Sequence, residues 1–240
     1  MRIYFWSYRQ IITGGLVLLL LIIAGTISYG RINAEVTVLQ GKSPWQPIYQ
    51  GNSDSPKMAL TFNVDWGEEY LPEILDQLKE YRVKCTFFLT GRWAQKFPAV
   101  AKLIAQEGHE IGNHGYSHPH PDRLSKNENQ EEIFRTEKAL LEITGQKTSL
   151  FAPPYGEHGS QVLEAAEELG YRTILWTIDT IDWDSNRSPE MIFAKVKEKA
   201  QKGAIVLMHP TERTVQALPL ILKYLQQEGY ALVTVSQVLN

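Results

Sequence analysis

Residues 58–89 read MALTFNVDWGEEYLPEILDQLKEYRVKCTFFL, and this stretch decides the fold. Residues 58–64 form a short apolar run rich in residues that favour strands. Residues 71–81 then repeat apolar side chains every three or four positions, which is typical of an amphipathic helix, and residues 85–89 form a second apolar run. The stretch therefore predicts a strand, a helix and a second strand, an arrangement that makes the two strands parallel.

The same alternation continues to the C-terminus. We expect further strands at residues 109–113, 149–152, 171–177, 204–208 and 231–235. Further helices are expected at residues 97–106, 133–143, 162–169, 191–200 and 218–225. Gly108, Gly170 and Gly229 each follow a helical pattern and are expected to end it in the left-handed conformation. Seven strands alternating with helices predict an α/β fold with a parallel sheet, either open or closed into a barrel.

The first 57 residues differ in character from the rest of the chain. Arg2 and Arg9 precede an uncharged stretch at residues 11–29, which is long enough to cross a bilayer as a helix. Positive charge before the stretch predicts a cytoplasmic segment at 1–10, a transmembrane signal-anchor at 11–29, a linker at 30–57 and an extracytoplasmic domain at 58–240. The protein is then a single-pass protein of the cell membrane. The alternative is a cleaved signal peptide, which makes the domain secreted.

Composition excludes several classes of function. The net charge is −3, from 24 basic and 27 acidic side chains, so nucleic acid is not an expected partner. Cys85 is the only cysteine, which excludes an internal disulfide and a cysteine-based zinc site. Composition does not specify an oligomeric state.

Chemically capable or rigid residues follow five of the predicted strands. These elements are Asp65, His114, the Pro153-Pro154-Tyr155 run, Asp179 and His209. The carboxyl ends of parallel strands meet at one rim, where active sites of α/β proteins assemble. We therefore expect these side chains to lie close together.

His114 and His118 are the strongest local signal of a metal site. Two imidazoles four residues apart can face the same way on one helical turn and bind one cation. The alternative is a pair of surface histidines, but Asp65 at another strand end favours a metal. One carboxylate and two imidazoles leave coordination positions open, which suits a catalytic metal.

Two other rim residues suggest how a substrate would be handled. His209 ends a buried strand, where an imidazole is well placed for proton transfer, with Asp179 available to hold its ring. The alternative is a core histidine. Trp183 follows a strand and could stack on the apolar face of a sugar or simply pack at the rim.

Five motifs in order resemble the polysaccharide deacetylase (NodB-homology) family, and its sporulation-associated, PdaB-like members most closely. They are TFNVD at residues 61–65, GHEIGNHGYSH at 108–118, FAPPYG at 151–156, DTIDW at 179–183 and IVLMH at 205–209. The resemblance covers residues 58–240. It implies a distorted, incomplete (β/α)7 barrel and the removal of N-acetyl groups from peptidoglycan, chitin or related glycans.

The resemblance also implies roles for individual residues. Asp65, His114 and His118 would bind zinc, cobalt or another divalent ion, and the backbone N–H of Tyr155 would stabilise the oxyanion. His209 would protonate the departing amine, tuned by Asp179. Substrate contacts are expected from Pro154, Trp183 and Leu207.

Two positions depart from the family pattern. Asn63 stands where the family has its general base, an aspartate, and Ala152 stands where the family has the arginine that orients this base. Asparagine accepts no proton at neutral pH, but a metal-bound water could still support some hydrolysis. Glu68 or Glu69 could replace the base, although a charge at a helix N-terminus, which the helix dipole favours, is the preferred interpretation of each. The alternatives are therefore a deacetylase with an altered site, a non-catalytic glycan-binding or scaffold protein, and a hydrolase of another amide.

Overall fold

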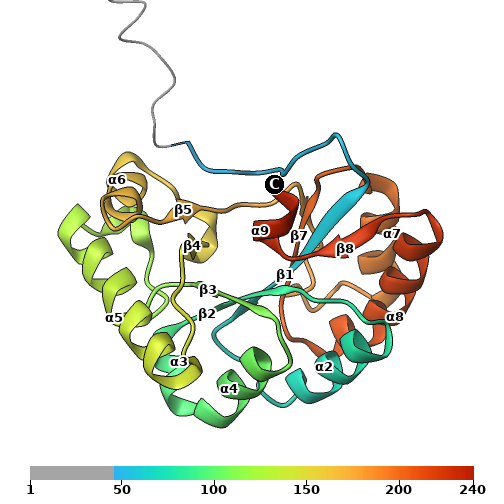
Figure 1. Ribbon diagram of the computed structural model, residues 1–240, viewed down its shortest axis with the longest axis horizontal. Coiled ribbons are helices and arrows are strands. Elements are labelled where there is room, and N and C mark those ends of the chain that lie inside the picture. The colour runs from blue at the N-terminus through green and yellow to red at the C-terminus, as the bar shows by residue number, and fades with distance from the viewer. Residues whose placement is uncertain (1–45) are drawn as a thin grey trace, which may run out of the picture. The chain divides into compact units, whose positions relative to one another are not determined.

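The computed structural model describes residues 46–240, which belong to one compact unit (Figure 1). The expected cytoplasmic segment, signal-anchor and first part of the linker lie outside the described residues. Within residues 46–240, no helix combines the length and apolar character that crossing a bilayer requires.

The core of the fold is a curved parallel sheet with helices around its outer face (Figure 1). Its order is β5-β4-β3-β2-β1-β7-β6, and β8 pairs with β1 as well. The strands are β1 (Lys57–Val64), β2 (Thr86–Leu89), β3 (Glu110–Asn113), β4 (Leu150–Phe151), β5 (Arg172–Thr173), β6 (Ile178–Asp179), β7 (Ile205–Met208) and β8 (Ala231–Val233). The expected parallel sheet is therefore confirmed, in the form of a half-barrel.

The six expected helices are present, and the structure adds two short ones at Gly91–Lys96 and Val235–Val238. The helices are α2 (Leu71–Glu80), α3 (Gly91–Lys96), α4 (Pro98–Gln106), α5 (Lys126–Thr144), α6 (Ser160–Glu168), α7 (Pro189–Lys199), α8 (Glu212–Gln227) and α9 (Val235–Val238). The glycines expected to end helices have the left-handed backbone, with φ of 80° at Gly108, 79° at Gly170 and 81° at Gly229.

The strand predicted at residues 171–177 is shorter in the structure, where only β5 lies within it and β6 begins directly after it. β5 pairs with β4 at one edge of the sheet, whereas β6 pairs with β7 at the other. The chain between them crosses from one edge to the other, so it cannot remain in a single ladder. The sheet consequently has eight strands where the sequence pattern predicts seven.

The end of the expected linker, residues 46–57, belongs to the domain. The backbone N–H of Ile48 donates to Thr173, and the N–H of Leu175 donates back to Ile48. Three residues further on, the N–H of Gly51 donates to Gly203, which precedes β7. This segment thus connects the β5 edge of the sheet to the start of β7, and the domain begins earlier than residue 58.

Candidate functional site

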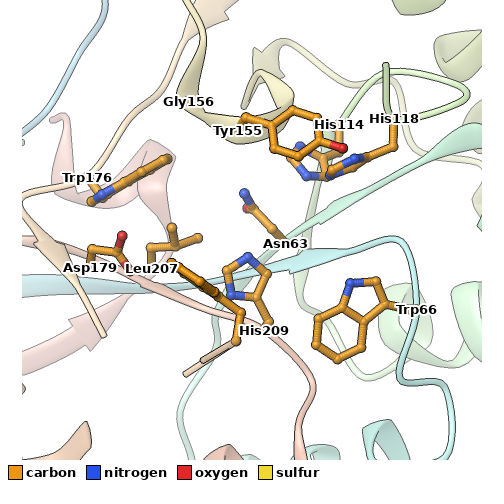
Figure 2. Close-up of a pocket in the computed structure, with 11 residues that line it drawn as sticks. Asn63, Trp66, His114, His118, Tyr155, Gly156, Trp176, Asp179, Leu207 and His209 are labelled. Carbon is orange, nitrogen blue, oxygen red and sulfur yellow. The ribbon is translucent and has the colours of Figure 1, made fainter. Parts of the chain in front are cut away.

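The expected rim residues meet at a pocket of about 420 Å³ at the carboxyl ends of the strands (Figure 2). Figure 2 shows Asn63 between His209 and the imidazoles of His114 and His118. The residues that line the pocket are Asn63, Trp66, His114, His118, Tyr155, Gly156, Trp176, Asp179, Trp183, Leu207 and His209. Two expected site residues, Asp65 and Pro154, are not among them.

The partner of His209 is Asp182, which corrects the expectation that Asp179 holds this ring. One carboxylate oxygen of Asp182 lies 2.8 Å from His209 Nδ1, and the other accepts the His209 backbone N–H at 2.6 Å. The same oxygen accepts the hydroxyl of Thr214 at 2.6 Å, and Asp182 is fully buried. Asp179 instead accepts the backbone N–H of Ile181 and faces the pocket.

The loops that carry the site have unusual backbone conformations. Among residues 46–240, four non-glycine residues have positive φ, and three of them lie at this rim: His118 at 55°, Tyr155 at 58° and Ile181 at 58°. A β-branched residue such as Ile181 rarely adopts this conformation, and backbone strain of this kind clusters at functional sites. At Ile181 the turn places the next side chain, Asp182, against His209.

The two imidazoles of the HxxxH motif lie on a loop, not on a helical turn as expected. Their ring centroids are 5.0 Å apart. Burial lowers the pKa of His114 to about 3, with a further contribution from the nearby His118. Burial likewise lowers the pKa of His118. Both rings are therefore neutral at pH 7, which is the form that binds metals.

A buried contact orients the His114 ring. Its Nδ1 lies 2.6 Å from the carbonyl oxygen of Ala152, so Nδ1 carries the proton and Nε2 is left with its lone pair. A backbone carbonyl that accepts from the second nitrogen is the usual companion of a metal-binding histidine.

Glu132 on α5 holds the loop that leads to His118, a role that the sequence did not reveal. One of its carboxylate oxygens accepts the backbone N–H groups of Tyr116 at 2.8 Å and Ser117 at 2.7 Å. The other accepts the Ser117 hydroxyl at 2.9 Å. Because Glu132 is far from the motif in sequence, only folding brings the two together.

The carboxylate of Asp65 is turned away from the pocket and pairs with Arg92. Arg92 Nε donates to Asp65 Oδ1 at 2.8 Å, a second guanidinium nitrogen donates to Oδ2, and the Thr90 hydroxyl donates to Oδ1 at 2.8 Å. Burial acts to raise the pKa of Asp65, but the hydrogen bonds from Arg92 and Thr90 outweigh it, and the pKa is lowered.

The expected metal set is therefore only partly assembled. His114 and His118 offer neutral imidazoles, but both oxygens of Asp65 are already engaged. Among residues 46–240, no group of three or more His, Cys, Asp or Glu side chains is arranged to hold a cation. The imidazoles fit a divalent ion, whereas the carboxylate in this position does not.

Tyr155 and its neighbours form an aromatic wall beside the imidazoles. The Tyr155 ring stacks on His120, with centroids 4.0 Å apart, and lies edge-on to His118 at 4.8 Å. His120 is held in turn by Glu157 at 2.7 Å. The next residue, Gly156, has a φ of 67°, and a Cβ there would lie 2.7 Å from the Trp176 ring. Glycine is thus required for this close approach.

Two exposed tryptophans, Trp66 and Trp183, line the pocket together with His209. Trp183 is 58% exposed at the pocket, as the sugar-stacking interpretation requires. Trp66 was not singled out from the sequence, yet its ring lies parallel to His209 at 6.1 Å and is 43% exposed. Its position directly after Asp65 was the available signal.

Comparison with known proteins identifies the family. The family model described as polysaccharide deacetylase matches residues 50–174. The chain belongs to the polysaccharide deacetylase family. The expectation from the five motifs is thereby confirmed at the level of the family, and the likeness to its PdaB-like members stays a prediction.

Two curated relatives belong to the comparison. The chain is 40% identical to the uncharacterized protein YlxY of Bacillus subtilis over 81% of its own length and 61% of that protein. It is 37% identical to a peptidoglycan-N-acetylglucosamine deacetylase of Bacillus cereus, over 78% of the chain and 69% of the relative. The chain thus spans less than two thirds of YlxY.

A solved structure resembles this family member in sequence and in shape. It is BA3943 from Bacillus anthracis, described as a pseudoenzyme of family CE4, with a TM-score of 0.80 and 40% identity over 84% of this chain and 71% of that one. A BA3943 mutant with restored enzymatic activity superposes with the same TM-score of 0.80, at 39% identity over 84% and 74% of the two chains.

Proposed function

We propose that this protein is a carbohydrate de-N-acetylase of low activity that acts on N-acetylated amino sugars of peptidoglycan or chitin type. The observation that carries the proposal is the His209–Asp182 pair, which faces Asn63 and the two neutral imidazoles across one pocket. Family membership and the B. cereus relative support the same chemistry.

His209 is the proposed proton donor. The buried Asp182 carboxylate accepts from Nδ1, which leaves Nε2 for exchange with a substrate. When the His209 ring is doubly protonated, Nε2 also carries a proton. Water adds to the acetamide carbonyl and loses a proton to solvent. As the C–N bond breaks, the departing nitrogen takes the proton from Nε2, and solvent then replaces it. Acetate and a free amine are the products.

The backbone N–H of Tyr155 is the proposed oxyanion donor, and Pro154 would act by shaping its turn. Pro154 is buried, and Tyr155 follows it in the 3₁₀ turn Pro154–Gly156. Leu207, which is buried at the floor of the pocket, would contact the acetyl methyl group.

The low activity follows from the missing base. Asn63 lines the pocket but cannot take a proton from water, and a positioned general base is worth roughly 10²–10⁴ in rate. Glu68 and Glu69 do not line the pocket, so neither is a replacement in this arrangement. Glu68 lines a separate cleft together with Asp65 and Arg92.

Zinc, or cobalt or another divalent ion, remains part of the proposal. His114 and His118 would hold it, with Asp65 once that carboxylate is free of Arg92. When bound, such an ion supplies a Lewis acid that lowers the pKa of its water and polarises a carbonyl.

Trp66 and Trp183 would each bind a sugar ring of the substrate. Both are exposed at the pocket, and the faces of aromatic rings pack well against the apolar C–H faces of sugars. A substrate longer than one sugar is therefore proposed.

The proposed site of action is the outside of the cell membrane. Residues 11–29 would anchor the domain there, or release it if the segment is cleaved. A role in sporulation, as in PdaB-like members, belongs to the same proposal.

A non-catalytic glycan-binding protein is the second candidate. Two observations favour it. The chain has Asn63 and Ala152 in place of the family's aspartate and arginine, and it resembles the pseudoenzyme BA3943. In this case the pocket binds N-acetylated glycans without turnover.

Acetate release separates the candidates. Full-length protein with Zn²⁺ or Co²⁺ is incubated with N-acetylglucosamine oligomers, peptidoglycan and a sugar-free acetamide, and His209→Ala is the matched control. Acetate from the glycans that disappears in His209→Ala supports the deacetylase. Glycan binding without acetate supports the second candidate, and release from the sugar-free amide alone indicates a different amidase.

A further inference from the structure

Asp65 is held by two kinds of contact that differ in how easily they can be broken. The Thr90 contact is built into the sheet, because β1 and β2 are paired and the Thr90 backbone N–H donates to Val64 at 3.0 Å. Arg92 reaches the same carboxylate from the first turn of α3 through a long side chain that is 51% exposed. Arg92 can therefore withdraw into water, whereas Thr90 stays.

The Arg92 contact occupies the positions that a cation needs. A carboxylate offers about four lone-pair directions. Here Oδ1 accepts from both Thr90 and Arg92, and Oδ2 accepts from Arg92. The Asp65 side chain is only 10% exposed, so its pairing with the guanidinium is poorly screened by water. A divalent ion and a guanidinium on one carboxylate would also repel each other.

We propose that Arg92 is an internal competitor for the divalent ion, so that the cation site forms only when Arg92 releases Asp65. This inference rests on the proposed cation site of His114, His118 and Asp65. In the cation-free protein the guanidinium neutralises the carboxylate and turns it away from the pocket, into the cleft lined by Asp65, Trp66 and Arg92. Apparent cation affinity is then reduced by the fraction of molecules in which Asp65 is free.

The test compares Arg92→Gln with Lys96→Gln in the full-length protein. Lys96 is on the same helix and lines the same cleft, but its ammonium lies over the Phe97 ring, 4.8 Å from the centroid. The two variants lose the same charge, and only one loses the Asp65 contact. Isothermal titration with Zn²⁺ and Co²⁺ gives the affinity, and the visible absorption of bound Co²⁺ reports its coordination.

Arg92→Gln is expected to bind Zn²⁺ about tenfold more tightly than the wild type. This factor corresponds to an Arg92–Asp65 pair that is formed in roughly nine wild-type molecules of ten. Lys96→Gln is expected to change the affinity by less than about twofold, since a charge outside the site is screened. Adding His114→Ala to Arg92→Gln should abolish the gain. Thermal unfolding without metal verifies that each variant is folded.

The outcomes distinguish the inference from the proposed function. Stoichiometric uptake with the same affinity in wild type and Arg92→Gln overturns the role of Arg92 and leaves the cation site standing. An equal gain in Lys96→Gln also overturns it, because the effect is then one of net charge. No uptake by either the wild type or Arg92→Gln overturns both.

Discussion

The buried carboxylate of Asp182 meets His209 twice, at the ring Nδ1 and at the backbone N–H. Asparagine in place of Asp182 keeps the shape of the side chain, but only its single oxygen can accept a hydrogen bond, so it cannot accept from both the ring and the backbone of His209. We expect Asp182→Asn to lower the free energy of unfolding by about 1–3 kcal/mol, because a buried donor loses its acceptor. Urea denaturation measures this change.

The matched control for that substitution is Asp179→Asn. Asp179 is partly exposed at the pocket and accepts only the Ile181 backbone N–H, a bond that an asparagine oxygen can also accept. We expect a loss below about 1 kcal/mol. If Asp179→Asn destabilised the protein as much as Asp182→Asn, the assignment of Asp182 as the partner of His209 would be wrong.

Restoring the two missing family residues should raise activity. Asn63→Asp supplies a base, and Ala152→Arg supplies a cation to pair with it, so the double variant should release acetate about 10²–10⁴ times faster than the wild type. Asn63→Asp alone should gain less, because its carboxylate lacks the orienting partner. A double variant slower than the wild type would mean that another base already serves the site.

Gly156 should tolerate no side chain because of Trp176. Gly156→Ala combines a left-handed backbone with a Cβ 2.7 Å from the indole, so we expect a loss of about 2–4 kcal/mol in urea denaturation. Gly145→Ala is the control, since its φ is 72° and a Cβ there would meet nothing within 4 Å. It should lose only about 1 kcal/mol. Equal losses would show that the indole contact contributes nothing.

Glu132 should be needed for the order of the loop before His118. Glu132→Ala removes the acceptor of two backbone N–H groups and one hydroxyl, and we expect a loss of about 1–3 kcal/mol. Hydrogen exchange at the Tyr116 and Ser117 amides should quicken in this variant. The exposed neighbour Glu131 provides the control, and Glu131→Ala should stay within about 0.5 kcal/mol with unchanged exchange.

Stability should fall in acid partly because of His109, which lies outside the pocket. Burial lowers the pKa of His109 to about 4, and its Nδ1 accepts the Cys85 backbone N–H at 3.1 Å. The unfolded chain takes up this proton near pH 6.5, so between pH 6.5 and 4 it binds more protons than the folded chain. Neutral His109 therefore contributes about 3 kcal/mol to the free energy of unfolding above pH 6.5. This contribution is lost as the pH falls from 6.5 to 4.

The variant His109→Gln checks this pH dependence, because its amide oxygen can still accept from Cys85. Urea denaturation at several pH values between 4 and 7 should give a shallower decline for His109→Gln than for the wild type. Identical slopes would rule out His109 as a source of the acid sensitivity.

Local patterns were sufficient for the order of most strands and helices and for the rim positions of His114, Tyr155, Asp179 and His209. Apolar spacing and the glycines that end helices depend on neighbours along the chain. The rim positions follow because the carboxyl ends of all the parallel strands lie at the same rim of the sheet. The family likewise followed from motifs that are contiguous in sequence.

Partnerships between distant side chains depended on the folded chain. The positive φ of Ile181 turns Asp182, and not Asp179, toward His209. Arg92 reaches Asp65 only because β1 and β2 lie side by side, and Glu132 reaches the His118 loop only because α5 packs beside it. A carboxylate can accept from any donor that folding brings near, so its partner is a property of three-dimensional packing and not of the residue or its neighbours in sequence.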